Sequence, residues 1–249
     1  MNQLEQLGFK DDKTIVKNDL GGLNTSGIRI EYDDSRVVLK DNLVDFSIPK
    51  LNITEELKDA EAEKRKSDFM NNTDLSVKFI ELLEIAYDGK RNRDFEIITI
   101  ELFRKVYGLN AVLLGGGRKP DGLVSTNDYG IIIDTKAYSN GYSKSISQED
   151  EMVRYIEDNQ LRDKNRNPTE WWENFPQAIT QDNFYFMWIS SKFIGRFQEQ
   201  LSSTYHRTNI KGAALNVEQL LLGADAIIKG KLNVNDIPDH VENKEIIWF

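Results

Sequence analysis

The most constraining stretch of the chain is an apolar run that ends in polar residues, Ile-Ile-Ile-Asp-Thr-Lys at 131–136. Strands with one solvated face alternate apolar and polar residues, so unbroken β-branched side chains are typical of a strand covered on both faces. We therefore predict a central strand over 129–136. Because side chains two residues apart lie on one face of a strand, Asp134 and Lys136 are expected to be neighbours.

A second strand is predicted at 121–125, joined to the first by a turn at 126–128. In an antiparallel pair, Asp121 at the start of one strand lies beside Asp134 at the end of the other. Mg²⁺ binds oxygen ligands and keeps several waters, so one or two carboxylates suffice to hold it. The carbonyl of Thr135 is a candidate third protein oxygen.

These residues predict a metal-dependent phosphodiester hydrolase, in which the Lys136 ammonium stabilises charge on the phosphate and helps orient the attacking water. The alternative is an ordinary Asp–Lys pair at the end of a surface strand. On the first interpretation, the catalytic residues are Asp121, Asp134 and Lys136, and the ligands of Mg²⁺, with Mn²⁺ as substitute, are Asp121, Asp134 and Thr135.

Glycines precede the first aspartate, in Gly-Gly-Gly-Arg-Lys at 115–119. A Walker loop needs Gly-Lys followed by Ser or Thr and then a helix. Here Lys119 is followed by Pro120 and a predicted strand, which argues against a nucleotide-binding loop and an ATP-dependent phosphotransferase. Glycines also permit sharp turns and close backbone approach to DNA. Arg118 and Lys119 are therefore candidate DNA-phosphate contacts.

Composition excludes several other kinds of site. The chain has no cysteine and two histidines, which excludes disulfides and thiolate zinc and leaves little room for a histidine-based metal cluster. No apolar run approaches the roughly 18 residues of a membrane span, and no signal pattern is present, so we expect a cytoplasmic protein. A net charge of −9 argues against tight unaided DNA binding.

The chain divides into three parts. Residues 1–53 are predicted to contain a helix at 14–20, ended by Gly21 and Gly22, and a β-hairpin at 28–39; this pattern fits a winged helix. Residues 54–70 form a charged helix with few apolar positions, which is typical of a linker. Residues 71–249 alternate helices and strands, which indicates an α/β fold with a mixed central sheet flanked by helices.

One predicted helix, over 145–159, carries Asp150 and Arg154 four residues apart on one face. Considered alone, this spacing indicates an intrahelical ion pair. The aromatic residues Trp171, Trp172 and Trp188 are interpreted as core rather than as base-stacking platforms.

Five longer motifs are distinctive: Gly-Gly-Gly-Arg-Lys-Pro-Asp-Gly (115–122), Ile-Asp-Thr-Lys-Ala-Tyr-Ser (133–139), Asp-Glu-Met-Val-Arg-Tyr (150–155), Asn-Pro-Thr-Glu-Trp-Trp (167–172) and Leu-Leu-Leu-Gly (220–223). Together they resemble the cleavage domain of FokI-like type IIS restriction endonucleases. Shorter motifs resemble the end of that family's recognition region: Leu-Gly-Phe (7–9), Asn-Asp-Leu-Gly-Gly-Leu (18–23), Leu-Lys-Asp (39–41) and Phe-Ser-Ile-Pro (46–49).

The resemblance implies a PD-(D/E)xK restriction-endonuclease-like fold, with Asp121, Asp134 and Lys136 at the matching positions. It implies Mg²⁺-dependent hydrolysis of double-stranded DNA to 5′-phosphates, without sequence preference, at a distance from the recognised site. It also implies a transient homodimer of cleavage domains, in which Asp150 of one copy meets Arg154 of the other.

Most of that family's recognition region has no counterpart here. The acidic charge is accounted for if a basic recognition domain brings the cleavage domain to DNA. The chain is then expected to be a fragment of one type IIS enzyme, or a cleavage subunit that works with a separate recognition subunit in a nicking or restriction system. A third alternative is a non-catalytic DNA-binding module of winged-helix type.

Overall fold

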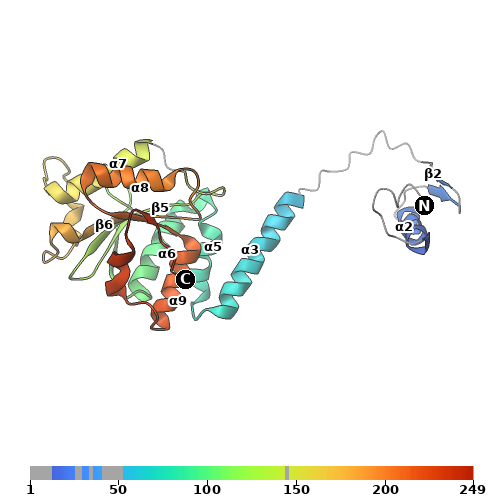
Figure 1. Ribbon diagram of the computed structural model, residues 1–249, viewed down its shortest axis with the longest axis horizontal. Helices are drawn as coiled ribbons and strands as arrows, with labels where there is room; N and C mark the ends of the chain where they lie inside the picture. The colour runs from blue at the N-terminus through green and yellow to red at the C-terminus, as the bar shows by residue number, and fades with distance from the viewer. Residues whose placement is uncertain (1–12, 26–29, 34–35, 41–52, 144–145, 249) are drawn as a thin grey trace. The chain divides into compact units, whose positions relative to one another are not determined.

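The computed structural model describes residues 13–25, 30–33, 36–40, 53–143 and 146–248, which belong to two compact units, Met1–Thr54 and Glu55–Phe249 (Figure 1). Within these ranges, no helix is both long enough and apolar enough to cross a membrane.

The first unit contains helix α2 (Lys13–Thr25) and a hairpin of β1 (Ile30–Tyr32) and β2 (Val37–Leu39). The expected break at Gly21 and Gly22 is wrong, since α2 runs through both glycines. A glycine inside a helix costs only about 1 kcal/mol. The winged-helix interpretation of residues 1–53 stays a prediction, and its segments 1–12, 26–29, 34–35 and 41–52 lie outside the described residues.

The charged helix expected at 54–70 extends over Ile53–Asn72 as α3. From residue 55 onward the helix belongs to the second unit, where Arg65 Nη1 donates to Glu218 Oε1 at 3.0 Å and to the Tyr87 hydroxyl at 3.2 Å. Lys66 Nζ donates to Glu84 Oε1 at 2.5 Å. Two basic side chains of α3 therefore pair with carboxylates elsewhere in the same unit.

The second unit is built on a six-stranded sheet in the order β3-β4-β5-β6-β7-β8. The first three strands pair antiparallel, and β5 to β8 pair parallel, which confirms the predicted mixed sheet. The strands are β3 (Asn110–Leu113), β4 (Gly122–Ser125), β5 (Gly130–Lys136), β6 (Phe184–Ser190), β7 (Gly212–Asn216) and β8 (Lys244–Glu245). The sequence did not indicate β8, because two charged residues carry no strand pattern.

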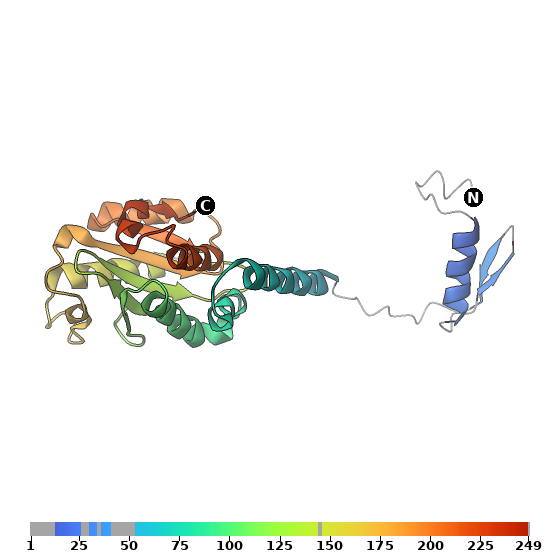
Figure 2. The same ribbon diagram turned by 90° about the horizontal axis from the view of Figure 1, so that it is seen from below.

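Helices cover both faces of this sheet (Figures 1 and 2). One face packs against α5 (Leu82–Ile85), α6 (Asn92–Lys105) and α9 (Val217–Ile228), and the other against α7 (Ile146–Leu161) and α8 (Phe197–Thr208). The remaining helical segments are α4 (Val77–Ile80) and the 3₁₀ turns η2 (Gly89–Arg91), η3 (Trp171–Asn174), η4 (Gln181–Asn183) and η5 (Val234–His240).

Strand β5 contributes to both cores, as its unbroken apolar run predicted. Ile131 and Ile133 belong to the cluster on the α6 side, and Ile132 to the cluster on the α7 side. The three tryptophans interpreted as core are confirmed as buried in the α7-side cluster, with exposures of 3% or less for Trp171, Trp172 and Trp188. Because β5 is covered on both faces, its polar end lies at the margin of a dry core.

Candidate active site

The pairing of β4 with β5 brings two acidic residues together. The strands are antiparallel, with Gly122 opposite Ile133, so Asp121 just before β4 lies across from Asp134 near the end of β5. A tight turn makes the connection, and the Thr126 amide donates to the Tyr129 carbonyl at 3.0 Å. The antiparallel adjacency predicted for the two aspartates is confirmed.

Thr135 fixes the orientation of the Asp121 carboxylate. The Thr135 amide donates to Asp121 Oδ2 at 2.7 Å, and its hydroxyl donates to the same oxygen at 3.0 Å. Thr135 itself is buried in the strand. Its amide and hydroxyl thus serve to hold Asp121, a role that the sequence did not suggest.

Asp134 and Lys136 form a buried charge pair on the α7 side of the sheet. Lys136 Nζ lies 2.7 Å from Asp134 Oδ2 and 5.7 Å from the centre of the Trp188 ring. Asp134 is only 2% exposed. The Lys136 ammonium is therefore the partner of the buried Oδ2 atom, which has no further polar partner among the described residues.

Burial and neighbouring charges together shift the pKa values of both groups. It raises the pKa of Asp134 to about 8, with a further contribution from the Asp121 charge, while Lys136 acts in the opposite direction. Burial lowers the pKa of Lys136, but the charges of Asp134 and Asp121 outweigh it, so the pKa is raised overall. A cation that binds between the aspartates would offset the free-energy cost of ionising the buried Asp134 carboxylate.

Two glutamates that the sequence did not assign to the site lie within electrostatic reach of it. Glu96 on α6 has a side chain only 17% exposed and pairs with Arg93. Burial raises the pKa of Glu96, and the charge of Asp121 raises it further. The sequence did not assign Glu96 to the site, because a helical pattern does not reveal which strand end the helix covers.

The second glutamate is Glu151 on α7. Its charge contributes to raising the pKa of both Asp134 and Lys136, and its Oε1 accepts a hydrogen bond from the Tyr155 hydroxyl at 3.1 Å. In the sequence it appears only as one acidic residue among several in a helix. Its closeness to the strand end follows from the packing of α7 on the sheet.

The glycine loop that precedes β4 comprises residues 115–120. Gly115, Gly116 and Gly117 have φ of 59°, 73° and 72°, in the left-handed region that glycine adopts without strain. Arg118 is exposed and Lys119 half-buried. Since β4 rather than a helix follows the loop, the rejection of a nucleotide-binding loop stands.

On α7, the two charged residues predicted for a dimer contact have separate partners within the chain. Arg207 Nη1 lies 2.7 Å from Asp150 Oδ1, and Arg154 Nη2 lies 3.5 Å from Glu151 Oε1. The intrahelical pair suggested by their spacing is therefore wrong. Both residues lie on the helix that covers the Asp134 side of the sheet.

The acidic pair suits a hard divalent cation. The buried Asp134 carboxylate, beside that of Asp121, supplies the hard oxygen atoms that such a cation coordinates. The described ranges hold no group of three or more His, Cys, Asp or Glu residues arranged around a common ion. Two carboxylates agree with Mg²⁺, which keeps several water ligands, and disagree with a closed zinc site.

A family model described as the FokI cleavage domain matches residues 57–247. This chain belongs to the FokI cleavage domain family. It is 41% identical over 250 residues to the type II restriction enzyme FokI of Planomicrobium okeanokoites, covering 98% of this chain and 43% of that protein. It is 34% identical over 238 residues to the type II restriction enzyme StsI of Streptococcus sanguinis, covering 94% of this chain and 39% of that protein.

Solved structures agree with this assignment. The structure of the restriction endonuclease FokI matches with a TM-score of 0.74 and 39% identity, covering 99% of this chain and 44% of that chain. The structure of FokI bound to DNA matches with a TM-score of 0.73 and 40% identity over the same shares. The restriction-endonuclease-like fold expected from the sequence is confirmed, and the chain spans less than half the length of these relatives.

Proposed function

We propose that this member of the FokI cleavage domain family is a Mg²⁺-dependent endonuclease that hydrolyses phosphodiester bonds of double-stranded DNA and leaves 5′-phosphates. The observation that carries the proposal is the buried Asp134–Lys136 pair, at 2.7 Å, on the strand beside Asp121. Membership of the family adds independent support.

Asp121, Asp134 and the Thr135 carbonyl would hold the metal, and Mn²⁺ is expected to substitute for Mg²⁺. A bound Mg²⁺ supplies positive charge for the phosphoryl oxygens and a water of lowered pKa. Thr135 pre-orients Asp121 through two hydrogen bonds, so little reorganisation is needed when the carboxylate takes up its ligand position. Because Asp134 is buried, bulk water does not compete with the metal for its carboxylate.

In the proposed site, Lys136 supplies the positive charge that stabilises the transition state. Its side chain is 20% exposed, and contact with Asp134 and the Trp188 ring limits its movement. The neighbouring carboxylates keep it protonated at neutral pH, so an ammonium is available to stabilise the charge that develops on the phosphate. Glu151 adds negative charge that helps to keep this proton in place.

We propose that cleavage has no sequence preference of its own and occurs at a distance from a recognised site. The relatives are type II restriction enzymes more than twice as long as this chain, and one was solved bound to DNA. A net charge of −9 supports delivery by a separate reader, since affinity for DNA phosphates comes mostly from basic residues. Arg118 and Lys119 are the proposed local phosphate contacts.

We further propose that residues 1–53 form the end of a winged-helix-like recognition subdomain, that 54–70 act as the linker and that 71–249 form the nuclease domain. Two cleavage domains would associate transiently through α7, with Asp150 of one copy facing Arg154 of the other. A two-fold interface makes this pair twice, and each site cuts one strand.

The proposal is tested with supercoiled plasmid DNA, Mg²⁺ or EDTA, and the variants Asp134→Ala and Asp121→Ala. Both variants should lose cleavage while still unfolding cooperatively. Asp128→Ala is the matched control, because Asp128 is an exposed aspartate in the turn between the same two strands. Cutting retained by Asp134→Ala, or cutting in EDTA, contradicts the proposal.

The product ends provide a separate check. Ligase should reseal the products without kinase treatment, because ligation requires a 5′-phosphate. If the wild-type chain shifts DNA mobility but does not cut at high protein and Mg²⁺ concentrations, the non-catalytic binding module becomes the better explanation.

A further inference from the structure

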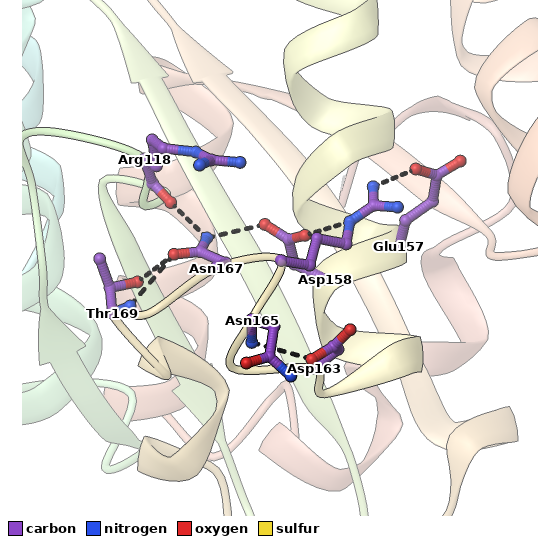
Figure 3. A network of polar contacts seen from close by, with 8 residues as sticks. Arg118, Glu157, Asp158, Asp163, Asn165, Asn167 and Thr169 are labelled. Atoms are coloured by element: carbon purple, nitrogen blue, oxygen red, sulfur yellow. Dashed lines mark hydrogen bonds and ion pairs between the residues drawn. The ribbon is translucent and has the colours of Figure 1, made fainter.

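A buried polar cluster joins α7 to the glycine loop (Figure 3). Its centre is Asn167, in the connection between α7 and η3, which has no exposed surface, and Asp158 on α7 is 1% exposed. Neither residue touches the aspartates of the proposed site. The cluster is therefore a separate structural feature on the same side of the sheet.

The side chain of Asn167 satisfies its full hydrogen-bonding capacity. Its Nδ2 donates to the Arg118 carbonyl at 2.8 Å and to Asp158 Oδ2 at 2.8 Å. Its Oδ1 accepts from the Thr169 hydroxyl at 2.8 Å and from the Thr169 amide at 3.2 Å. An amide offers two donors and two acceptor positions, so all four are used here. The orientation of the amide group is thereby determined.

The other oxygen of Asp158 is also held. Arg166 Nε donates to Asp158 Oδ1 at 2.8 Å, and Nη2 of the same guanidinium contacts Glu157. Asp158 is thus a compensated buried carboxylate that cannot turn away from Asn167 without losing a charged partner. The cluster ties Asn167 firmly to α7.

The glycine loop is held at its base by its own backbone and further out by this cluster. Its base continues the β3–β4 ladder, because the Leu114 amide donates to the Asp121 carbonyl at 2.9 Å and the Gly115 amide donates to the Pro120 carbonyl at 3.3 Å. Among the described residues, the bond from Asn167 to Arg118 is the hydrogen bond that reaches residues 116–119 from outside the loop. Arg118 takes part through its backbone, and its side chain stays exposed.

We propose that Asn167 is a positioning residue: by holding the Arg118 carbonyl, it keeps the glycine loop and the adjoining Asp121 in register with α7. Its consequence for catalysis rests on the proposed function. The loop carries the proposed phosphate contacts, and α7 carries Asp150 and Arg154 of the proposed dimer contact. The Asn167 amide therefore links α7, which carries the proposed dimer contact, to the glycine loop, which carries the proposed DNA contacts.

The test uses an exchange of the two interacting groups in the full chain. Asn167→Asp alone places two carboxylates together and is expected to lower the midpoint of thermal unfolding. Asp158→Asn combined with Asn167→Asp restores a donor–acceptor pair between the two positions and leaves Arg166 its acceptor. The exchanged pair still provides no donor for the Arg118 carbonyl, so it separates stability from loop positioning.

Two readouts are needed. Limited trypsin digestion with mass spectrometry reports the rate of cleavage after Arg118, since Pro120 protects the bond after Lys119. Steady-state cleavage of a DNA substrate in Mg²⁺ reports kcat and KM. Asn165→Ala is the control, because Asn165 lies in the same connection, is exposed, and contacts Asp163 through its backbone amide.

We expect the exchanged pair to recover part of the unfolding midpoint that Asn167→Asp loses, to be cut after Arg118 at least about tenfold faster than wild type, and to lose about tenfold or more in kcat. Wild-type trypsin resistance after Arg118 would overturn the proposal, as would a wild-type kcat despite a loosened loop. If no chain cleaves DNA, the proposed function fails, while the trypsin result still decides whether Asn167 holds the loop.

Discussion

Arg207 on α8 lies 2.7 Å from the carboxylate of Asp150 on α7, measured from Nη1 to Oδ1. The same guanidinium lies 3.5 Å from Glu149. Hydrogen bonding to Asp150 is the main reason why the pKa of Arg207 is raised. Within one copy of the chain, Asp150 therefore already has a cationic partner, and in the proposed dimer Arg154 of a second copy would have to compete with it.

Replacing Arg207 by Ala should favour association of two copies. The pair is largely exposed, so we expect its loss to change folding stability by no more than about 1 kcal/mol. Asp150 becomes available, and sedimentation in Mg²⁺ with DNA should show more dimer than wild type. Arg196→Ala is the control, since Arg196 is the N-cap of the same helix and, within the described ranges, forms an ion pair with Glu199 at 3.6 Å. Less dimer would mean that Arg207 itself belongs to the interface.

The raised pKa of Asp134 predicts a pH-dependent stability. Folding shifts this pKa from 3.8 to about 8, so between those values the folded state keeps a proton that the unfolded state releases. Stability then falls as pH rises through this window. The side chain of Asp134→Asn cannot ionise, so this variant should not lose stability in that way. In EDTA, the difference in unfolding midpoint, variant minus wild type, should be at least about 3 °C larger at pH 8 than at pH 5.

Mg²⁺ provides the complementary measurement. It favours the ionised carboxylate, so it should raise the unfolding midpoint of wild type at pH 8 and have much less effect on Asp134→Asn. If the unfolding midpoints of wild type and Asp134→Asn in EDTA differ by the same amount at every pH, Asp134 is not the titrating group.

Removing the Lys136 ammonium should affect the rate of cleavage rather than DNA binding. We expect Lys136→Ala to reduce kcat by about 10²-fold or more, with DNA affinity in Ca²⁺ within about threefold of wild type. Lys136→Arg should not restore activity, because a planar guanidinium spreads and displaces the charge that the compact ammonium places beside Asp134. Lys231→Ala, at an exposed position, should behave as wild type; a proportional loss of affinity in Lys136→Ala would indicate a simple phosphate contact.

The glycine loop should tolerate only residues that adopt a left-handed backbone. Gly116 has φ of 73°, and a Cβ there would meet nothing within 4 Å, so strain rather than crowding opposes a side chain. Gly116→Ala should lower the free energy of unfolding by about 1–2 kcal/mol, and Gly116→Asn by less, as Asn enters this region more easily. Denaturant unfolding measures both; equal losses would argue against backbone strain as the cause.

Local sequence determined much of the candidate site. The apolar run before Asp134 indicated a strand covered on both faces, and a period of two placed Lys136 beside Asp134. The short turn at 126–128 made an antiparallel partner the natural one, which brought Asp121 to the same edge. These relationships span few residues, and strand geometry alone decides them.

Tertiary packing decided the rest. Glu96 and Glu151 approach the strand end because α6 and α7 lie on opposite faces of the sheet. Arg207 meets Asp150 across 57 positions, and Asn167 meets the Arg118 carbonyl across 49. Hydrogen bonds and ion pairs between distant segments depend on how helices dock, and a helical pattern shows which face is apolar but not what that face will cover.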